Sequence, residues 1–178
     1  MDDAALISLA TQLGATLNSR GLTLSLAESC TGGMASQYVT AIAGSSAWFD
    51  RAFITYSNQA KIDMLDVSKQ NLDNFGAVSE QTAQAMAVGS LNNSLADIVA
   101  SITGIAGPSG GTEDKPVGMV CFGFAFKAPA FNSKITQQTN PQVITQTKLF
   151  AGNRDDVRKQ SVNHVLETLI TLTLSMDL

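Results

Sequence analysis

Ser29 and Lys61 are the residues of this 178-residue sequence whose types and settings most favour chemistry. Ser29 lies within Ala27-Glu28-Ser29-Cys30-Thr31-Gly32-Gly33, after a run of alternating leucines and before a stretch of small residues. A strand that turns through Ser, Thr and Gly into a helix leaves backbone N–H groups unpaired, and these can receive an anion or a developing oxyanion. The sequence therefore predicts a serine hydroxyl beside a set of free amides at the edge of a sheet.

A serine hydroxyl needs a base before it becomes a nucleophile, and the base predicted here is a lysine. The single histidine, His164, shares its predicted helix face with polar residues, which indicates a surface position and argues against a Ser-His-Asp triad. Lys61 falls in the first turn of a predicted helix, where the helix dipole and any burial lower the pKa of the amine. The alternative is that Lys61 is a surface lysine and Ser29 a helix cap.

Three further residues are weaker candidates for chemistry or binding. Cys30 could replace Ser29 as nucleophile, although the lack of a histidine partner favours a small core residue. Tyr56 ends a predicted strand five residues before Lys61, where it can hydrogen-bond a substrate or pack in the core. Arg154, in the first turn of the last predicted helix, can clamp a phosphate or pair with the neighbouring acids.

No His, Cys, Asp or Glu set has metal-ligand spacing, so neither a metal nor a cofactor is expected.

The loop at residues 104–111 is a second candidate for anion binding, because it follows a buried strand and is dense in glycine. Glycine permits a close approach of the backbone to a ligand. The loop lacks the spacing of a dinucleotide or Walker phosphate loop, so an ordinary surface loop is the alternative.

Hydrophobic periodicity and capping residues predict an alternation of helices and strands. Helices are predicted over 3–20, 34–43, 58–65, 79–91 and from 152 onward. Strands are predicted over 22–27, 47–56, 96–103, 117–127 and 142–150, the last two paired antiparallel. Residues 66–78 are expected to be a connection with some local structure, and 128–141 a loop or elongated hairpin tip. The fold class is therefore α/β: a three-layer α/β/α sandwich around a mixed sheet.

Length and composition predict one globular domain over residues 1–178. The net charge of −4, with scattered Lys and Arg, argues against nucleic acid or an anionic membrane surface as a partner. Two cysteines favour a reducing compartment. The sequence has no basic signal-peptide start and no run of about 18 apolar residues. We therefore expect a cytoplasmic protein with no membrane partner.

Four segments read together resemble the CinA C-terminal family, over about residues 5–175. They lie at 27–33, 44–49, 55–61 and 101–118. Within that family the similarity is to the stand-alone nicotinamide mononucleotide deamidases. The resemblance implies hydrolysis of the carboxamide of nicotinamide mononucleotide to nicotinate mononucleotide and ammonia, in pyridine-nucleotide salvage. It also implies a Ser/Lys amidase that needs no metal and forms a homodimer or higher oligomer, and the sequence leaves open whether a site near the subunit interface is completed by a second subunit.

The resemblance implies a role for each candidate residue. Ser29 is expected to attack the amide carbon, Lys61 to move the protons, and Tyr56 to position the ring or the amine. Oxyanion stabilisation is expected from the backbone of Cys30, Thr31, Gly32 and Gly33. Ribose and phosphate contacts are expected from Ser46, Thr103, Gly104, Ile105, Ala106, Gly107 and Arg154. The alternative function, motivated by the glycine-rich loops, is a non-catalytic nucleotide-binding regulatory module.

Overall fold

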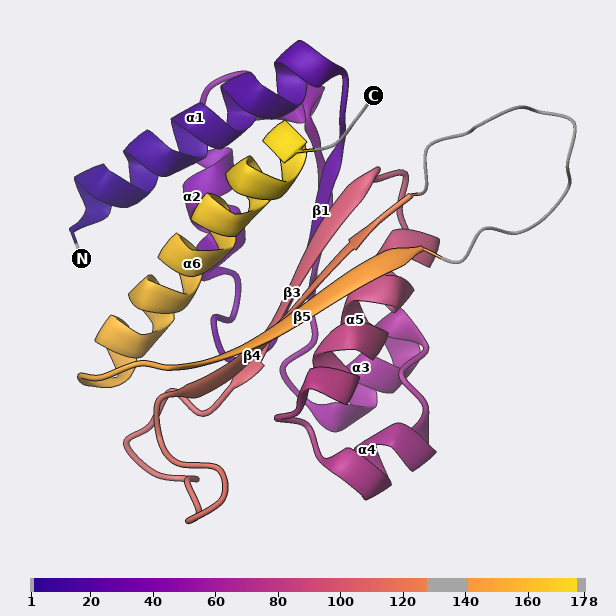
Figure 1. Cartoon of the computed structure of the whole chain (residues 1–178), viewed down its shortest axis with the longest axis vertical. Helices are drawn as coiled ribbons and strands as arrows, with labels where there is room; N and C mark the ends of the chain where they lie inside the picture. Colours follow the sequence, from indigo (N-terminus) through magenta and orange to yellow (C-terminus); the bar gives the residue numbers. More distant parts are fainter. Residues whose placement is uncertain (1, 128–140, 176–178) are drawn as a thin grey trace, which may run out of the picture.

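A five-stranded mixed sheet forms the centre of the computed structural model, which describes residues 2–127 and 141–175. The strand order is β2-β1-β3-β4-β5 (Figure 1). β1 pairs in parallel with β2 and β3, whereas β3 with β4 and β4 with β5 are antiparallel. The strands are β1 (Leu24–Glu28), β2 (Phe49–Ile54), β3 (Ile98–Gly104), β4 (Met119–Phe126) and β5 (Gln142–Leu149). The predicted antiparallel pair of the last two strands is confirmed.

Helices cover both faces of the sheet (Figure 1). One layer holds α1 (Asp3–Arg20), α2 (Met34–Thr40) and α6 (Arg154–Ser175). The other layer holds α3 (Asn58–Leu65), α4 (Lys69–Phe75) and α5 (Glu80–Asn92). The predicted three-layer α/β/α architecture is confirmed. Helix α4 lies where the sequence predicted only a connection with local structure, and most of the loop predicted at 128–141 lies outside the described residues.

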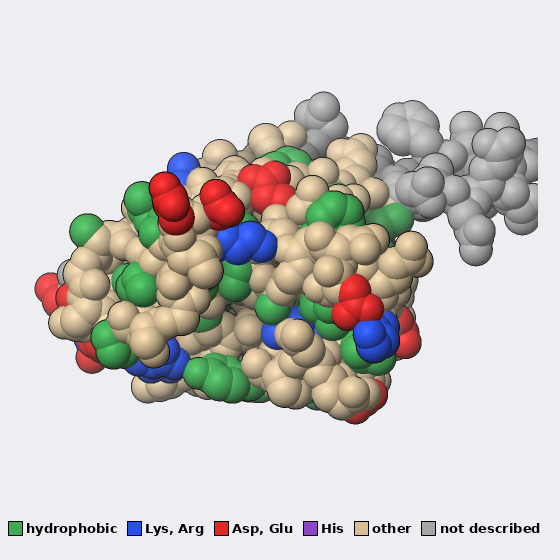
Figure 2. Space-filling view, turned by 90° about the horizontal axis from the view of Figure 1, so that it is seen from below, with side chains coloured by type: hydrophobic (Ala, Val, Ile, Leu, Met, Phe, Trp, Pro, Cys, Tyr) green, Lys and Arg blue, Asp and Glu red, His purple; other side chains and the backbone are tan. Residues whose placement is uncertain are grey.

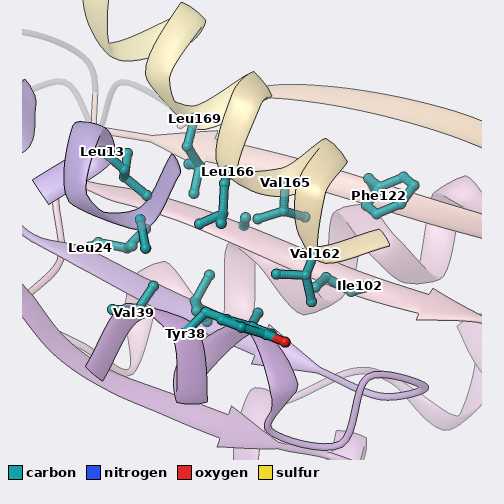
Figure 3. Packing of buried hydrophobic residues seen from close by; sticks show 14 of the residues in the cluster. Leu13, Leu24, Tyr38, Val39, Ile102, Phe122, Val162, Val165, Leu166 and Leu169 are labelled. Atoms are coloured by element: carbon teal, nitrogen blue, oxygen red, sulfur yellow. The ribbon is translucent and has the colours of Figure 1, made fainter. Parts of the chain in front are cut away.

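The larger apolar core lies between the sheet and the α1–α2–α6 layer (Figure 3). Leu166 and Leu169 of α6 face the sheet beside Leu13 of α1, and all three are fully buried. Because helices cover both faces, all five residues of β1 are buried rather than alternating with exposed ones. A polar residue in β1 must therefore find its hydrogen-bond partners inside the protein.

His164 contradicts the prediction of a surface histidine. Its ring is half-buried in α6 and packs edge-on against Phe122, with ring centroids 4.6 Å apart. His164 Nε2 lies 2.8 Å from Gln146 Oε1. Burial lowers the pKa of His164. The polar neighbours on its helix face did not reveal that aromatic residues of the sheet cover the ring.

The chain reverses its direction of travel across the sheet at β1. It passes from β1 through α2 on one face to β2, and then through α3, α4 and α5 on the other face to β3. Parallel α/β sheets bind ligands at the carboxyl ends of the strands beside such a reversal. Ser29 follows β1, Tyr56 follows β2 and Thr103 lies near the end of β3. The fold therefore brings the predicted site segments to one end of the sheet.

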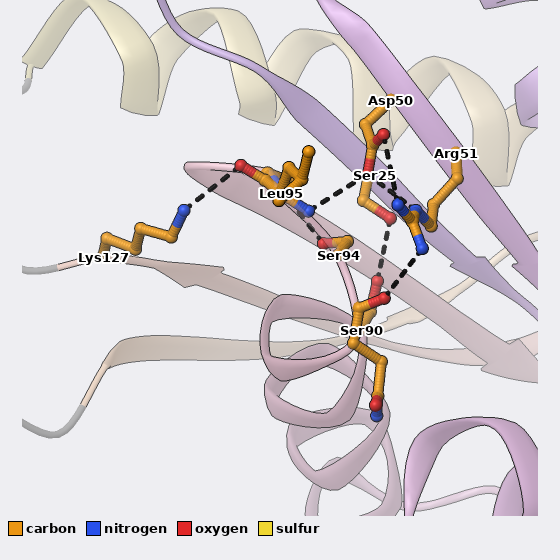
Figure 4. Close-up of polar contacts among 9 residues, drawn as sticks. Ser25, Asp50, Arg51, Ser90, Ser94, Leu95 and Lys127 are labelled. Carbon is orange, nitrogen blue, oxygen red and sulfur yellow. Dashed lines mark hydrogen bonds and ion pairs between the residues drawn. The ribbon is translucent and has the colours of Figure 1, made fainter.

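Polar contacts hold the opposite end of these strands together (Figure 4). Ser25 Oγ of β1 lies 3.0 Å from Ser90 Oγ of α5. Asp50 of β2 accepts a hydrogen bond from Leu95 N at 3.1 Å, and Lys127 Nζ donates to Leu95 O at 3.2 Å. These contacts join β1 to α5, and they join β2 and the residue after β4 to the loop between α5 and β3.

Gly89 lets α5 approach α3, the helix that carries Lys61. A Cβ at position 89 would lie 1.9 Å from the Leu65 carbonyl oxygen at the end of α3.

Replacing Gly89 with alanine tests this close packing. Helix propensity alone makes Gly→Ala stabilising by about 1 kcal/mol, but overpacking costs about 1–3 kcal/mol or more. We expect Gly89→Ala to lower the free energy of unfolding by about 2 kcal/mol, measured by urea denaturation. The control is Gln84→Ala on the exposed face of α5, which should change it by less than about 0.5 kcal/mol. A Gly89→Ala protein as stable as the wild type would contradict this packing account.

Candidate active site

Ser29 and Lys61, 32 positions apart in the sequence, are in direct contact. Lys61 Nζ lies 3.0 Å from Ser29 Oγ and donates a hydrogen bond to the Thr55 carbonyl oxygen at 2.8 Å. Both distances are within hydrogen-bond range. Only 8% of Ser29 and 1% of Lys61 are exposed. Lys61 is therefore not a surface lysine.

The start of α3 directs the Lys61 amine toward the sheet. Ser57 Oγ accepts a hydrogen bond from Ala60 N at 3.0 Å and so begins the helix. Lys61 and Leu65 are the two buried residues of α3, and four positions apart they share one helix face. The apolar packing of that face carries the lysine stem inward and places its amine beside Ser29.

Burial lowers the pKa of the Lys61 ammonium below its ordinary value of 10.5. The Cys30 sulfur raises that pKa only when it is a thiolate, but burial raises the pKa of the Cys30 thiol to about 12. At neutral pH the thiol therefore adds no charge. A neutral amine has one lone pair and two N–H donors, so it can accept the Ser29 proton while still donating to Thr55. The pair has the geometry and the pKa direction of a nucleophile and its base.

The turn after Ser29 is shaped by two glycines and a buried carboxylate. Gly32 has φ +56° and Gly33 has φ +94°. Residues other than glycine rarely adopt this left-handed backbone conformation. The Glu28 carboxylate, fully buried at the end of β1, accepts hydrogen bonds from Gly33 N at 3.0 Å and Ser36 N at 2.8 Å. The Glu28 carboxylate thus accepts the hydrogen bonds that these amides at the start of α2 could otherwise donate to a bound anion.

Of the four backbone amides predicted to stabilise an oxyanion, two already donate hydrogen bonds within the protein and two do not. Gly32 N donates to the Ser29 carbonyl oxygen at 3.1 Å, and Gly33 N donates to Glu28. Among the described residues, no oxygen accepts a hydrogen bond from the N–H of Cys30 or Thr31. The Cys30 and Thr31 amides therefore have no oxygen acceptor in this part of the protein, and the Cys30 amide, next to Ser29, is free to receive a ligand oxygen.

A cavity of about 300 Å³ lies beside Ser29 and Lys61. Several residues with a predicted role at the site line this cavity: Cys30, Tyr56, Thr103, Gly104, Ile105, Ala106, Gly107 and Arg154. Ser109 and Gly110 of the predicted anion-binding loop also line it, as do Asn58, Ala77 and Val78, which had no predicted binding role. Figure 2 shows this end of the molecule, where the visible basic side chains are scattered among acidic, apolar and tan atoms rather than gathered in one patch.

Arg154 joins two walls of this cavity. Its guanidinium donates to Gly107 O at 2.8 Å and to the Tyr56 hydroxyl oxygen at 2.8 Å. Ile105 N donates to Met119 O at 2.9 Å and is therefore occupied. In the described part of the chain, no acceptor is bonded to the amides of Ala106 and Gly107. A guanidinium beside two free amides suits an anionic group.

The structure does not bring every predicted residue to the cavity. Ser46 is exposed in the short 3-10 helix Ser45–Ala47, which precedes β2, whereas Tyr56 follows the other end of that strand. Six strand residues span about 20 Å. Thr31, Gly32 and Gly33 form the turn behind Ser29 and do not line the cavity. The Thr103 hydroxyl donates to Ala77 O at 2.7 Å and keeps its acceptor capacity.

Two charged residues near the site had no predicted role. Glu28 carried a signal, because it is the one charged residue of β1 and stands at the end of that strand. Arg158 donates to the Thr31 carbonyl oxygen at 2.7 Å and borders a neighbouring cavity of about 620 Å³ together with Arg154. The two arginines are four positions apart in α6, a spacing that places both on one helix face.

Residues 2–127 and 141–175 contain no cluster of three or more His, Cys, Asp or Glu that could hold a metal ion. Within the same ranges, no helix combines the length and hydrophobicity that crossing a membrane requires.

Fold and site together define a class of α/β protein with a buried Ser/Lys pair where the strand order of a mixed sheet reverses. The chain belongs to the CinA C-terminal domain family, whose profile matches residues 6–173. It is 46% identical over 169 residues to nicotinamide-nucleotide amidohydrolase PncC of Escherichia coli K12, covering 95% of both chains. PncC of Enterobacter agglomerans is 45% identical over 170 residues, which cover 96% of both chains. The predicted family resemblance is confirmed.

Solved structures of similar proteins have the same fold. The competence/damage inducible protein CihA from Agrobacterium tumefaciens is 40% identical, with a TM-score of 0.85 over 97% of this chain and 96% of that one. A CinA superfamily protein from Klebsiella pneumoniae is 33% identical, with a TM-score of 0.86 over 96% and 99% of the two chains.

The Lys61 amine should titrate below 10.5, because burial disfavours its charged form. As the pH falls from 10.5, this amine should stay neutral until the lowered pKa is reached. The measurement is an NMR titration of ¹³C-labelled lysine side chains, with the Lys61 signal assigned by its absence in Lys61→Met. In Ser29→Ala the midpoint should remain lowered, since burial and not the hydroxyl is the cause. A Lys61 midpoint at or above 10.5 would contradict the assignment.

Proposed function

We propose that this protein is a nicotinamide-nucleotide amidohydrolase that converts nicotinamide mononucleotide to nicotinate mononucleotide and ammonia through Ser29 and Lys61. The observation that carries the mechanism is the 3.0 Å contact between Lys61 Nζ and Ser29 Oγ beside a cavity. The substrate is supported by the curated relatives named nicotinamide-nucleotide amidohydrolase, at 46% identity over 95% of the chain.

In the first half of the reaction, Ser29 Oγ attacks the carboxamide carbon while the neutral Lys61 amine takes its proton. The carbonyl oxygen becomes an oxyanion, and the free amide of Cys30, which lines the cavity, donates a hydrogen bond to it. Each such donor is worth about 3–4 kcal/mol in comparable sites. Cys30 itself remains a thiol, because burial raises its pKa to about 12.

In the second half, the Lys61 ammonium gives its proton to the departing nitrogen, so ammonia leaves instead of an amide anion. The products of this step are ammonia, a nicotinoyl ester on Ser29 and a neutral Lys61 amine. Water then attacks the ester carbon and gives a proton to Lys61, which returns it to Ser29 Oγ. Ser29 and the neutral Lys61 amine are thereby restored, and the product leaves as a carboxylic acid whose proton passes to solvent to give the carboxylate.

Arg154 and the loop after β3 hold the phosphate of the substrate. The Arg154 guanidinium and the free Ala106 and Gly107 amides supply donors at one wall of the cavity. The Tyr56 hydroxyl, held by Arg154 at 2.8 Å, positions the substrate next to the Ser29–Lys61 pair. The ribose lies between these groups, where Thr103 Oγ1 can accept a hydrogen bond.

The proposed function includes the wider assignments that the family resemblance implies. They are a homodimer, a cytoplasmic location and a place in pyridine-nucleotide salvage. Ser46, about 20 Å from the cavity along β2, contacts substrate only if a second subunit brings it there.

Ammonia release from nicotinamide mononucleotide tests the proposed chemistry directly. We expect Ser29→Ala and Lys61→Met each to lower kcat by about 1,000-fold or more, because one removes the nucleophile and the other its base. The matched control is Lys69→Met, which removes an exposed lysine at the start of α4 and should leave kcat unchanged.

Wild-type activity that survives in both Ser29→Ala and Lys61→Met would exclude the Ser/Lys mechanism. Saturable mononucleotide binding by the wild type without ammonia release would instead support the non-catalytic nucleotide-binding module.

A further inference from the structure

The Glu28 side chain is a buried anion next to the proposed nucleophile in the sequence, yet the proposed reaction gives it no task. None of its surface is exposed, and β1 ends at this residue. Its carboxylate accepts hydrogen bonds from Gly33 N, Ala35 N and Ser36 N at 3.0, 3.1 and 2.8 Å, and from Ser36 Oγ. One side chain therefore gathers the backbone at the start of α2.

Burying a carboxylate is costly unless hydrogen bonds replace its water. Four donors satisfy Glu28, and all four come from residues 33–36. The side chain thus ties the end of β1 to the start of α2 across the turn that presents Ser29. Gly33 is the N-cap of α2 and makes no side-chain cap of its own. Glu28 supplies the acceptor that a Ser or Asp cap ordinarily provides.

Two more contacts restrain the same turn. Ser29 N donates to Ile102 O of β3 at 2.9 Å, and Arg158 of α6 donates to Thr31 O at 2.7 Å. With Glu28 holding the far end, the backbone of residues 29–33 is fixed at its start, middle and end. The Cys30 and Thr31 amides within this span are the ones left without an oxygen acceptor among the described residues.

We propose that Glu28 is a positioning residue: its buried carboxylate holds the turn after Ser29 so that the Cys30 amide meets the oxyanion. This role rests on the proposed function, because it presumes that Ser29 forms a tetrahedral intermediate. Glu28 touches neither substrate nor the reacting atoms, and acts through the backbone that it anchors.

A role for Glu28 through its negative charge and a role through its hydrogen bonds predict opposite changes in kcat when the side chain is made neutral. A negative charge at the start of α2 opposes an oxyanion nearby, so a role through charge alone predicts a faster enzyme when residue 28 is neutral. A positioning role predicts a slower enzyme, because Gln has one acceptor oxygen where the carboxylate has two, and its amide group repels backbone N–H donors.

Kinetics of Glu28→Gln separate these roles. We expect kcat for ammonia release to fall by about 100-fold, the loss that a displacement of about 1 Å from productive geometry produces. KM should change by less than about 3-fold, since the substrate-holding groups on the loop after β3 and on α6 are untouched. Glu28→Asp keeps the charge but shortens the reach, so its kcat should fall while its KM also stays near the wild-type value.

The matched control is Glu80→Gln in the opposite helical layer. Glu80 also uses both carboxylate oxygens, accepting from the Thr145 and Thr147 hydroxyls at 2.7 Å, but it lies outside the cavity beside Ser29. Its kcat should equal that of the wild type. Circular dichroism and thermal unfolding report the folded fraction of each variant, so the kcat values are compared per folded molecule.

Each outcome decides the role of Glu28. A kcat for Glu28→Gln equal to or above the wild-type value overturns it, and so does a wild-type kcat for Glu28→Asp. If neither variant folds, or if kcat falls only in proportion to the folded fraction, Glu28 serves folding and the positioning role is wrong. A wild type that releases no ammonia is a different failure, that of the proposed function itself. Activity abolished by Ser29→Ala but unchanged by Glu28→Gln removes the positioning role alone.

Discussion

The removal of the Lys61 amine from water is the constraint on which the candidate site depends. An ammonium at this position gives up solvation for two contacts, the Thr55 carbonyl oxygen and Ser29 Oγ. Its pKa falls in consequence, and this lowered pKa is what suits Lys61 to the role of base in the proposed reaction. The burial requires α3 to pack closely on α5 at Gly89, so the chemistry of one amine depends on how two helices fit together.

Glu28 and Lys61 are two buried ionisable groups with opposite environments. The carboxylate has four donors and is fully satisfied, whereas the amine has two contacts and a lowered pKa. A satisfied buried charge rigidifies its surroundings, while an under-solvated one is reactive. The pair illustrates how a fold assigns one ionisable group to structure and another to chemistry at the same end of a sheet.

Much of the architecture was predictable because it rests on local signals. The helices predicted over 58–65 and 79–91 are observed as α3 and α5, and the alternation of apolar strands with periodic helices correctly indicated a three-layer sandwich. Local signals failed where distant residues decide burial. The His164 ring is covered by Phe122 of β4, and helix α4 formed where the sequence indicated only a connection. The cover over His164 is not encoded in its neighbours in the sequence, whereas α4 does carry local signals that the interpretation missed, because Ser68 caps its start and Gly76 follows its end.

By itself, the sequence determined the family, the fold class and the residue types able to do the chemistry, because motifs, periodicity and caps are properties of neighbouring residues. Only the tertiary structure decided that Ser29 meets Lys61, since the contact spans 32 positions and needs β1, β2 and α3 together. It also decided which amides are free, because Glu28 and the Ser29 carbonyl oxygen take up the Gly33 and Gly32 N–H groups. Hydrogen-bond donors are allotted by three-dimensional proximity, and no spacing along the chain records that allotment.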